Sequence, residues 1–200
     1  ILVNCLCEFT ELRWLACLSN CDVLYNVFVN GENLHDKTAI GIWGENFTKQ
    51  DRMRAKAVNF GIPYGREWPS FVDEFGVSKE EAKKMVKGWL DTYPGARDYL
   101  QWAADAAVKG YYLETPFGRR RRAGLVTPDS LHAVQNEFRN FPIQSASSDT
   151  TLTAAMEIEE FVSEYDAVIV NLVHDSIMFY VPAKKDVILN FGRRVHDLMI

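Results

Sequence analysis

An acidic residue interrupts an apolar stretch in the last third of the sequence. The stretch NLVHDSIMFYV, residues 171–181, sets His174, Asp175 and Ser176 between runs of β-branched and aromatic residues. An ionised carboxylate is costly in apolar surroundings unless it is paired, and Mg²⁺ takes one or two carboxylates together with substrate phosphate oxygens. The triplet therefore predicts either a metal-binding aspartate at a buried turn or a turn residue whose carboxylate bonds to its own backbone.

Two cations and an aromatic ring recur at four-residue spacing in RMRAKAVNFGIPYG, residues 52–65. On a helix, Arg52, Lys56 and Phe60 would share one face, which suits a triphosphate along the first turns and a sugar or base against the ring. The alternative is an ordinary surface helix whose phenylalanine packs in the core. Glycines on both sides of Tyr64 permit close approach of a ligand or partner and favour the nucleotide interpretation. Pro63 predicts that the helix ends or kinks before Tyr64.

Two further stretches carry groups that suit nucleic acid. In NFPIQSASSD, residues 140–149, the amides of Asn140 and Gln144 flank a proline. Side-chain amides can reach base edges in a minor groove, although helix capping is the plainer explanation. The run GRRRR, residues 118–122, places Arg119, Arg120 and two more arginines in an acidic protein, which favours phosphate contacts over a solvated hairpin arm.

The elements that must position these residues follow from periodicity and caps. We expect strands at 1–9 and 167–182. The second region should form two strands of a buried sheet, joined by a turn at the His-Asp-Ser triplet. Between them, helices are expected over 12–31, from about 49 and 79 after the capping patterns TKQD and SKEE, over 129–139 up to Pro142, and over 145–165. A hairpin should turn at 116–118, and a last helix should begin near Lys185. The order predicts an α+β fold, with a sheet built from both ends of the chain around a largely helical insertion.

Composition limits the classes of function. The chain has 200 residues, 48% of them hydrophobic, and a net charge of −5, so it can bury one or two cores but cannot hold polyanions by bulk charge. No apolar run reaches the roughly 18 residues that span a bilayer, and no signal peptide is recognisable, so we expect an intracellular, cytoplasmic protein with no membrane partner. The four cysteines lack usual zinc or disulfide spacing and are expected to be reduced. The oligomeric state is not indicated.

In this order and at these separations, the stretches resemble the polymerase core of family A DNA polymerases, the group that contains bacterial DNA polymerase I and many phage replicases. RMRAKAVNFGIPYG resembles motif B, LVHDS resembles motif C, and ELRWLACLS with NGENLHDKTA resembles motif A and the segment after it. TYPG, GYYLETPFGRRR and NFPIQS match in order as well. The resemblance implies a palm with an antiparallel sheet at residues 1–30 and 126–200, and a largely helical fingers insertion at residues 31–125.

The chemistry that the resemblance implies is template-directed transfer of a dNTP to a primer 3′-hydroxyl at a two-metal Mg²⁺ site, in DNA replication or repair. By position, Asp175 would be a catalytic metal ligand. Arg52 and Lys56 would hold the triphosphate, with Lys56 also placed to protonate the leaving group. Phe60 and Tyr64 would meet the sugar and base of the nucleotide.

The same resemblance implies further roles in binding. Glu11 would lie beneath the 2′ position of the sugar and pair with Tyr64, which excludes ribonucleotides. His174 would lie near the primer end. Gln144, Asn140, Arg119 and Arg120 would contact the primer-template DNA.

The sequence departs from the family pattern at the motif A metal ligand. The family carries an aspartate five residues before the glutamate of ELR, and counting back from Glu11 gives Leu6. An apolar side chain cannot bind magnesium, so Glu8, the nearest acid, is the candidate second ligand and requires a gap or bulge in the strand. Ser176 also replaces a second motif C acid of bacterial members, as it does in related single-subunit RNA polymerases.

Three alternatives therefore stay open beside an active DNA polymerase. One is a catalytically impaired relative that binds primer-template without a complete metal site. Another is a single-subunit RNA polymerase, against which Phe60 and Glu11 argue. A hydrolase using Ser176, His174 and Asp175 is disfavoured, because adjacent residues on a strand point apart and no nucleophile elbow is present.

Overall fold

The computed structural model describes residues 1–199. The chain divides into two compact units. The first unit combines Ile1–Glu11 with the residues from Gln144 onward, and the second unit is Leu12–Ile143. The expected palm and fingers boundaries lie at 30/31 and 125/126, and the assignment of those names to residue ranges stays a prediction. Among the described residues, no helix is long and apolar enough to cross a membrane.

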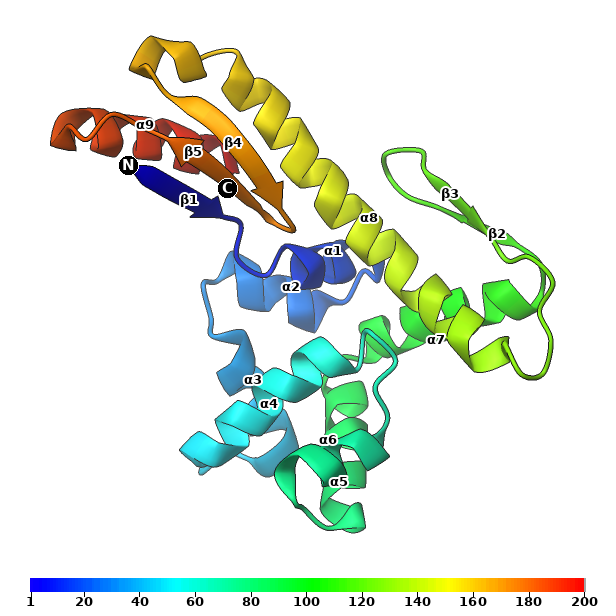
Figure 1. Cartoon of the computed structure of the whole chain (residues 1–200). Coiled ribbons are helices and arrows are strands. Elements are labelled where there is room, and N and C mark those ends of the chain that lie inside the picture. Colours follow the sequence, from blue (N-terminus) through cyan, green and yellow to red (C-terminus); the bar gives the residue numbers. More distant parts are fainter. Residues whose placement is uncertain (200) are drawn as a thin grey trace. The chain divides into compact units, whose positions relative to one another are not determined.

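The first unit contains a three-stranded antiparallel sheet that joins segments from distant parts of the sequence (Figure 1). Its strands are β1 (Leu2–Leu6), β4 (Val168–Val173) and β5 (Ser176–Tyr180), in the order β1-β5-β4. The register pairs Leu2 with Tyr180 and Leu6 with Ser176. The prediction that strands from both ends of the sequence form one sheet is thus confirmed.

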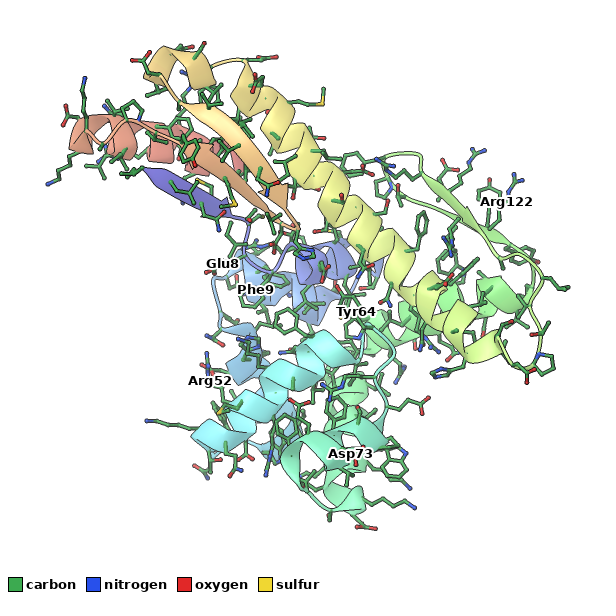
Figure 2. The ribbon with its side chains drawn as sticks, viewed as in Figure 1. Glu8, Phe9, Arg52, Tyr64, Asp73 and Arg122 are labelled. Carbon is green, nitrogen blue, oxygen red and sulfur yellow. The ribbon has the colours of Figure 1, made fainter. Side chains whose placement is uncertain are left out.

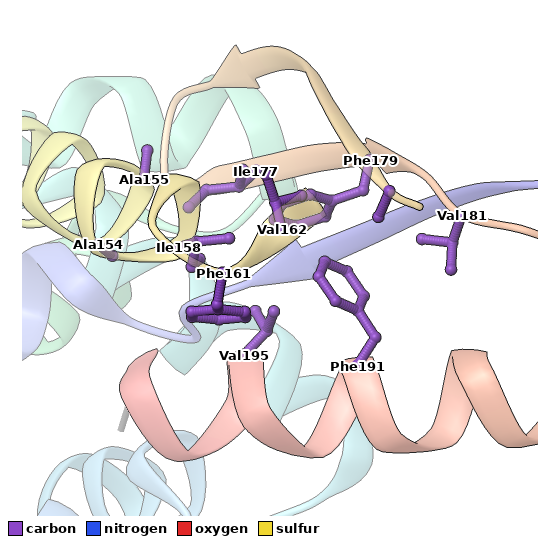
Figure 3. Close-up of a cluster of buried hydrophobic side chains, with 11 residues drawn as sticks. Ala154, Ala155, Ile158, Phe161, Val162, Ile177, Phe179, Val181, Phe191 and Val195 are labelled. Atoms are coloured by element: carbon purple, nitrogen blue, oxygen red, sulfur yellow. The ribbon is translucent and has the colours of Figure 1, made fainter. Parts of the chain in front are cut away.

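One face of this sheet packs on helix α9 (Lys185–Met199), which begins at the predicted residue. Ile177 and Phe179 alternate toward that face of β5 and are fully buried, as a two-residue period requires. Phe179 meets Phe191 of α9 edge to face, with ring centroids 5.0 Å apart (Figure 3). The core is completed by residues of α8 (Leu131–Glu159), of the short 3-10 helix η1 (Val162–Tyr165) and of the turn between them, namely Ala154, Ala155, Ile158, Phe161 and Val162.

Strand β4 differs from the expectation of a buried sheet. It is an edge strand that pairs only with β5 in the described chain, and four of its apolar side chains are 38–58% exposed, at Val168, Val170, Leu172 and Val173. A strand at the edge of a sheet with one uncovered face keeps its outward side chains in solvent, however apolar they are. The apolar composition of residues 167–173 therefore indicated a strand correctly but did not indicate its burial.

The single helix expected over 12–31 is two helices, α1 (Thr10–Leu18) and α2 (Asp22–Val29). Asn20 adopts the left-handed conformation, with φ of 46°, and the amide of Cys21 donates to the carbonyl of Ala16. Asn20 also donates to Cys17, so the two bonds form a Schellman motif that ends α1. Asparagine tolerates this conformation better than most residues, which is why the apolar periodicity did not reveal the break.

The second unit is built mainly of helices, and both predicted caps are present. The helices that follow α2 are α3 (Leu34–Trp43), α4 (Lys49–Gly61), α5 (Trp68–Phe75), α6 (Lys79–Thr92) and α7 (Pro94–Val108). Thr48 and Asp51 form a reciprocal capping box at the start of α4, and the Ser78 hydroxyl accepts from the amide of Glu81 at the start of α6. Helix α4 ends at Gly61, before Tyr64, as Pro63 predicted.

The predicted hairpin follows α7. Strands β2 (Tyr112–Glu114) and β3 (Arg120–Arg122) pair antiparallel, with Tyr112 opposite Arg122. Two backbone hydrogen bonds close the turn. The amide of Thr115 donates to the carbonyl of Arg119, and the amide of Gly118 donates to the carbonyl of Thr115. Gly118 has φ of +81°, a conformation that a residue with a side chain rarely adopts, so the glycine supplies the turn.

Pro142 does not end a helix, contrary to the sequence prediction. Helix α8 runs without interruption from Leu131 to Glu159 and joins the two helices expected at 129–139 and 145–165. Proline lacks the N–H that would bond to Phe138 and costs about 3 kcal/mol inside a helix. Buried residues on either side, including Phe138, Ile143 and Ala146, offset that loss by packing.

Candidate nucleotide and nucleic-acid sites

A cavity of about 720 Å³ lies within the first unit, at the tip of the β4–β5 hairpin. It is lined by Glu11, Gln144, Ser147, Ser148, Thr151, Leu152, Leu172, His174 and Asp175. Four of these residues were predicted from the sequence as site residues, namely Glu11, Gln144, His174 and Asp175. The structure brings them together at one cavity from three elements: the first turn of α1, the middle of α8 and the hairpin turn.

The hairpin turn that carries Asp175 is fixed by the backbone. His174 adopts a left-handed conformation with φ of 55°, and the Ser176 hydroxyl donates to the carbonyl of Val173 at 2.9 Å. The amide of Cys7, just beyond β1, donates to the carbonyl of Asp175 at 3.1 Å. Asp175 is only half-buried, which corrects the expectation of a buried carboxylate, because it sits at the tip of a hairpin on the rim of a cavity.

Helix α8 contributes polar cavity residues that the sequence analysis did not identify. Ser147, Ser148 and Thr151 line the cavity together with Gln144. The spacing of Gln144, Ser148 and Thr151 at i, i+4 and i+7 indicates one polar face of a helix. That signal is present in the sequence, but the helix break predicted at Pro142 made capping the plainer explanation of these polar residues.

Leu6, at the position of the motif A acid, and Glu8, the nearest acid, are both absent from the described lining of the cavity that contains Asp175. Leu6 ends β1 opposite Ser176 and is 53% exposed. Glu8 is exposed and follows β1 in the turn toward α1, where Phe9 has φ of 59° (Figure 2). Of the described residues that line the cavity, the acids are Glu11 and Asp175, and Glu8 is not among them. Across residues 1–199, no group of three or more His, Cys, Asp or Glu side chains is arranged to hold a metal ion.

Within the second unit, α4 presents the predicted cationic and aromatic face. Lys56 and Phe60 are exposed and Arg52 is half-exposed, whereas the intervening Ala55 and Val58 are fully buried. Arg52 lies on α4 (Figure 2), and its Nε donates to Asp36 Oδ1 of α3 at 2.6 Å. This bond fixes the guanidinium on the face that holds Lys56 and Phe60.

His35 on α3 belongs to the same face and was missed from the sequence. Its ring meets the Phe60 ring edge to face, with centroids 6.0 Å apart, and its Nδ1 lies 3.0 Å from the Asn59 amide nitrogen. Burial, and after it the charges of Arg52 and Lys56, lower the pKa of His35 to about 4. The segment NGENLHDKTA contains this histidine, but a lone histidine in a sequence gives no sign of the helix against which it packs.

Tyr64 follows the end of α4 and is half-buried. At Gly65, which has φ of +78°, an added Cβ would lie 2.2 Å from Asn136 Oδ1 of α8. The close approach that this glycine permits is therefore made by a side chain of the same unit. Glu11 belongs to the first unit and Tyr64 to the second, and their pairing stays a prediction.

The arginine-rich hairpin arm is exposed but partly neutralised. Arg120 Nε donates to Glu114 at 2.6 Å, and the guanidinium of Arg120 lies over the Tyr112 ring at 5.1 Å. Arg121 pairs with Glu137 of α8, and Arg122 of β3 (Figure 2) also lies over Tyr112. Residues 119–122 therefore form an exposed, positively charged stretch that is partly packed on the Tyr112 ring. Asn140 is half-buried on α8 in the second unit.

Comparison with known proteins identifies relatives over nearly the whole chain. The DNA polymerase of Mycobacterium phage D29 is 34% identical over 186 residues, which cover 92% of this chain and 29% of that protein. DNA polymerase I of Streptococcus pneumoniae strain R6 is 30% identical over 181 residues, covering 86% and 21%. The chain thus spans less than a third of the length of these relatives.

A solved structure matches the fold. The POL domain of Pol1 from M. smegmatis, in a complex with DNA primer-template and dNTP, superposes with a TM-score of 0.85 at 27% identity, covering 99% of this chain and 36% of that one. The α+β fold inferred from the sequence is confirmed by this match. The family described as DNA polymerase family A matches residues 7–199, and the chain therefore belongs to DNA polymerase family A.

Proposed function

We propose that this chain is the nucleotide- and primer-template-binding core of a DNA polymerase that transfers dNTPs to a primer 3′-hydroxyl under the direction of a template. The observation that carries the proposal is the cavity at the β4–β5 hairpin, where Glu11, Gln144, His174 and Asp175 meet. A carboxylate pair beside amide and hydroxyl groups suits the reacting phosphates, the sugar and the primer end. Membership of a family of DNA polymerases favours dNTPs over the substrates of a single-subunit RNA polymerase.

The α4 face supplies the proposed triphosphate contacts. Arg52, held by Asp36, would bind phosphate oxygens through its fork of N–H donors, and Lys56 one turn later would bind as a point charge. Lys56 would also deliver a proton to the leaving pyrophosphate oxygen, because it is exposed on the same face. Phe60, with 37% of its surface exposed, offers a ring face for the sugar or base, and Tyr64 follows it.

Template and primer contacts are proposed for three regions. His174 and Gln144, both on the cavity wall, would meet the primer end and the adjoining duplex. Asn140 would reach the minor groove, and Arg119 and Arg120 on the exposed hairpin arm would contact backbone phosphates. Since Arg120 already pairs with Glu114 and lies over the Tyr112 ring, binding of phosphate by Arg120 would replace an ion pair of the free chain.

The donors at the cavity fit one divalent cation better than two. Asp175 and Glu11 offer carboxylates at one cavity, and a single Mg²⁺ needs only one or two carboxylates plus substrate oxygens. Leu6 offers no metal ligand where the family pattern carries an acid, and Glu8 could help to hold an ion only if the turn after β1 rearranged, because Glu8 is not among the described residues that line the cavity. When bound, Mg²⁺ would supply Lewis-acid polarisation of the α-phosphate. We propose Asp175 as the metal ligand, with Glu11 or Glu8 as its partner.

A second candidate function is favoured by Leu6. With an apolar, half-exposed side chain at the end of β1, the chain would bind primer-template and dNTP but transfer nucleotides slowly or not at all. Both candidates share the binding surfaces and differ only in chemistry. Recovery of activity on restoring the acid separates them.

The test combines a binding assay and a primer-extension assay on the whole chain. Fluorescence anisotropy of labelled primer-template should show binding that the next templated dNTP tightens and a mismatched dNTP does not. Extension with Mg²⁺ is then compared among the wild type, Asp175→Asn, Glu11→Gln, Glu8→Gln and Leu6→Asp. Extension by the wild type that Asp175→Asn abolishes supports the polymerase proposal. The glutamate variant that raises the Mg²⁺ concentration needed for extension identifies the second ligand.

Two other outcomes are informative. Binding without extension, with extension gained in Leu6→Asp, supports the impaired relative. Absence of both primer-template binding and dNTP selectivity would refute the proposed function in either form.

A further inference from the structure

A buried polar network lies behind the α4 face, within the second unit. Its centre is Asn59 of α4, which is 1% exposed. Asn59 Oδ1 accepts from the Thr38 hydroxyl at 2.8 Å and from the Trp89 indole nitrogen at 2.9 Å. Thr38 in turn lies 2.8 Å from the Tyr93 hydroxyl. The network joins α3, α4 and α6 through side chains that are almost fully excluded from solvent.

The indole fixes the orientation of the Asn59 amide. An indole N–H can only donate, so the amide atom that faces Trp89 must be the oxygen. The amide nitrogen, a donor, then necessarily faces His35, whose Nδ1 lies 3.0 Å away. His35 Nδ1 must therefore be an acceptor without a proton, and a neutral imidazole with that arrangement carries its proton on Nε2.

The charged groups around the ring oppose a second proton. Burial lowers the pKa of His35 first, Arg52 and Lys56 of α4 lower it further, and Asp36 of α3 raises it less, leaving a pKa of about 4. Tyr93, which caps the C-terminus of α6, has a pKa raised to about 12 mainly by burial and stays uncharged. The imidazole ring is thus neutral beside two cations and in contact with Phe60.

We propose that Asn59 is a positioning residue for nucleotide binding, which acts by holding His35 as the neutral Nε2–H tautomer beside Arg52, Lys56 and Phe60. Its effect on binding rests on the proposed function, whereas the tautomer itself does not. A neutral ring fixed in this way carries its single N–H on Nε2 and adds no third positive charge to the face. Nucleotide affinity then does not depend on protonation of His35 at neutral or mildly acidic pH.

Two measurements test the proposal. The first is long-range ¹H–¹⁵N NMR of the imidazole nitrogens of the free chain, with the His35 signals assigned by their loss in His35→Gln. The wild type should carry the proton on Nε2. In Asn59→Asp, the carboxylate still accepts from Trp89 and Thr38 but must also accept from His35, so the proton should move to Nδ1 and the pKa of His35 should rise.

The second measurement is the dissociation constant of dATP from the same proteins between about pH 8 and about pH 5.5. The dissociation constant of each variant is divided by that of the wild type at the same pH, which cancels the effect of titration of the triphosphate. Asn59→Asp should bind about tenfold more weakly at the high end, as loss of one hydrogen bond to a charged group predicts, and should recover toward the low end as His35 gains a second proton. Tyr93→Phe is the matched control, because it removes a hydroxyl of the network without touching Asn59 or His35.

The outcomes separate the inference from the proposed function. A wild-type His35 that carries its proton on Nδ1, or is doubly protonated near neutral pH, overturns the proposal, and this measurement needs no variant to fold. An equal loss of affinity in Asn59→Asp and Tyr93→Phe, with no change in tautomer, would mean that the network is merely structural. A wild type with the Nε2 proton that fails to bind dATP refutes the proposed function and the role of Asn59 in binding, while it supports the tautomer.

Discussion

Lowering the pH should reduce the stability of the second unit through protonation of His35, before global unfolding in acid begins. The pKa of His35 falls from an ordinary value of 6.5 to about 4 in the folded chain, mainly because the ring is buried. Between these values the unfolded chain binds a proton that the folded chain does not, so stability is fully present above about pH 6.5 and is lost as the pH falls toward 4. At about 1.4 kcal/mol for each pKa unit, the full loss is about 3 kcal/mol, and about 2.5 kcal/mol is already lost by about pH 4.5.

Tryptophan fluorescence reports on this loss in the right part of the chain. All five tryptophans, including the network residue Trp89, lie between residues 12 and 143, and therefore in the second unit. Urea unfolding followed by their emission should give a free energy of unfolding that falls between about pH 7 and about pH 4.5 by about 2.5 kcal/mol more in the wild type than in His35→Gln. Carboxylate titration is common to both proteins and cancels in the comparison. If the two curves run parallel across this range, the burial argument for His35 is wrong.

Three further results are expected. Thr48→Ala should destabilise the second unit by about 1 kcal/mol in the same fluorescence assay, because it removes one half of the capping box with Asp51, and an unchanged midpoint would contradict that role. Phe179→Ala should cost about 3 to 5 kcal/mol, seen as a lower thermal midpoint by circular dichroism, since the ring is fully buried against Phe191; a loss below about 1 kcal/mol would mean that the first-unit core is loosely packed. Burial raises the pKa of Cys5, so iodoacetamide at mildly alkaline pH should label exposed Cys17 well before Cys5 by mass spectrometry, and equal rates would refute this.

Local chemistry explains the parts of the fold that the sequence predicted correctly. The capping box at Thr48, the hairpin turn at Gly118 and the end of α4 before Pro63 each depend on a few neighbouring residues. The pairing of β1 with β5 is a long-range feature, but it followed from two apolar stretches that each needed a partner strand. Motifs B and C then identified the family because their residue types and spacing are rare in combination.

The errors have both tertiary and local causes. Pro142 remains inside α8 because buried residues flank it, and no local rule weighs that packing against a missing hydrogen bond. Asn20 ends α1 through a conformation that glycine more often signals. The apolar composition of β4 did not distinguish an edge strand from a central one, since that difference is set by the strand order of the sheet.

The candidate site was predictable in its residues and less so in its arrangement. Glu11, Gln144, His174 and Asp175 come from three elements, and the sequence alone could not assign them to one cavity. The network that orients His35 was invisible for a related reason. Asn59, Trp89 and Thr38 lie on separate helices, and their role depends on which atom of an amide faces an indole.

The first unit is built from two distant segments of the sequence, which limits when it can fold during synthesis on the ribosome. Strand β1 leaves the exit tunnel before its hydrogen-bonding partner β5, which lies more than 160 residues later. At synthesis rates of about 5 to 20 residues per second, β1 waits roughly 10 to 35 seconds with its edge unsatisfied, while the helices of the second unit can already fold. Nascent chains stalled before residue 176 should therefore expose residues 1–7 to proteolysis or to a chaperone, and synthesis and pairing of β5 should protect them.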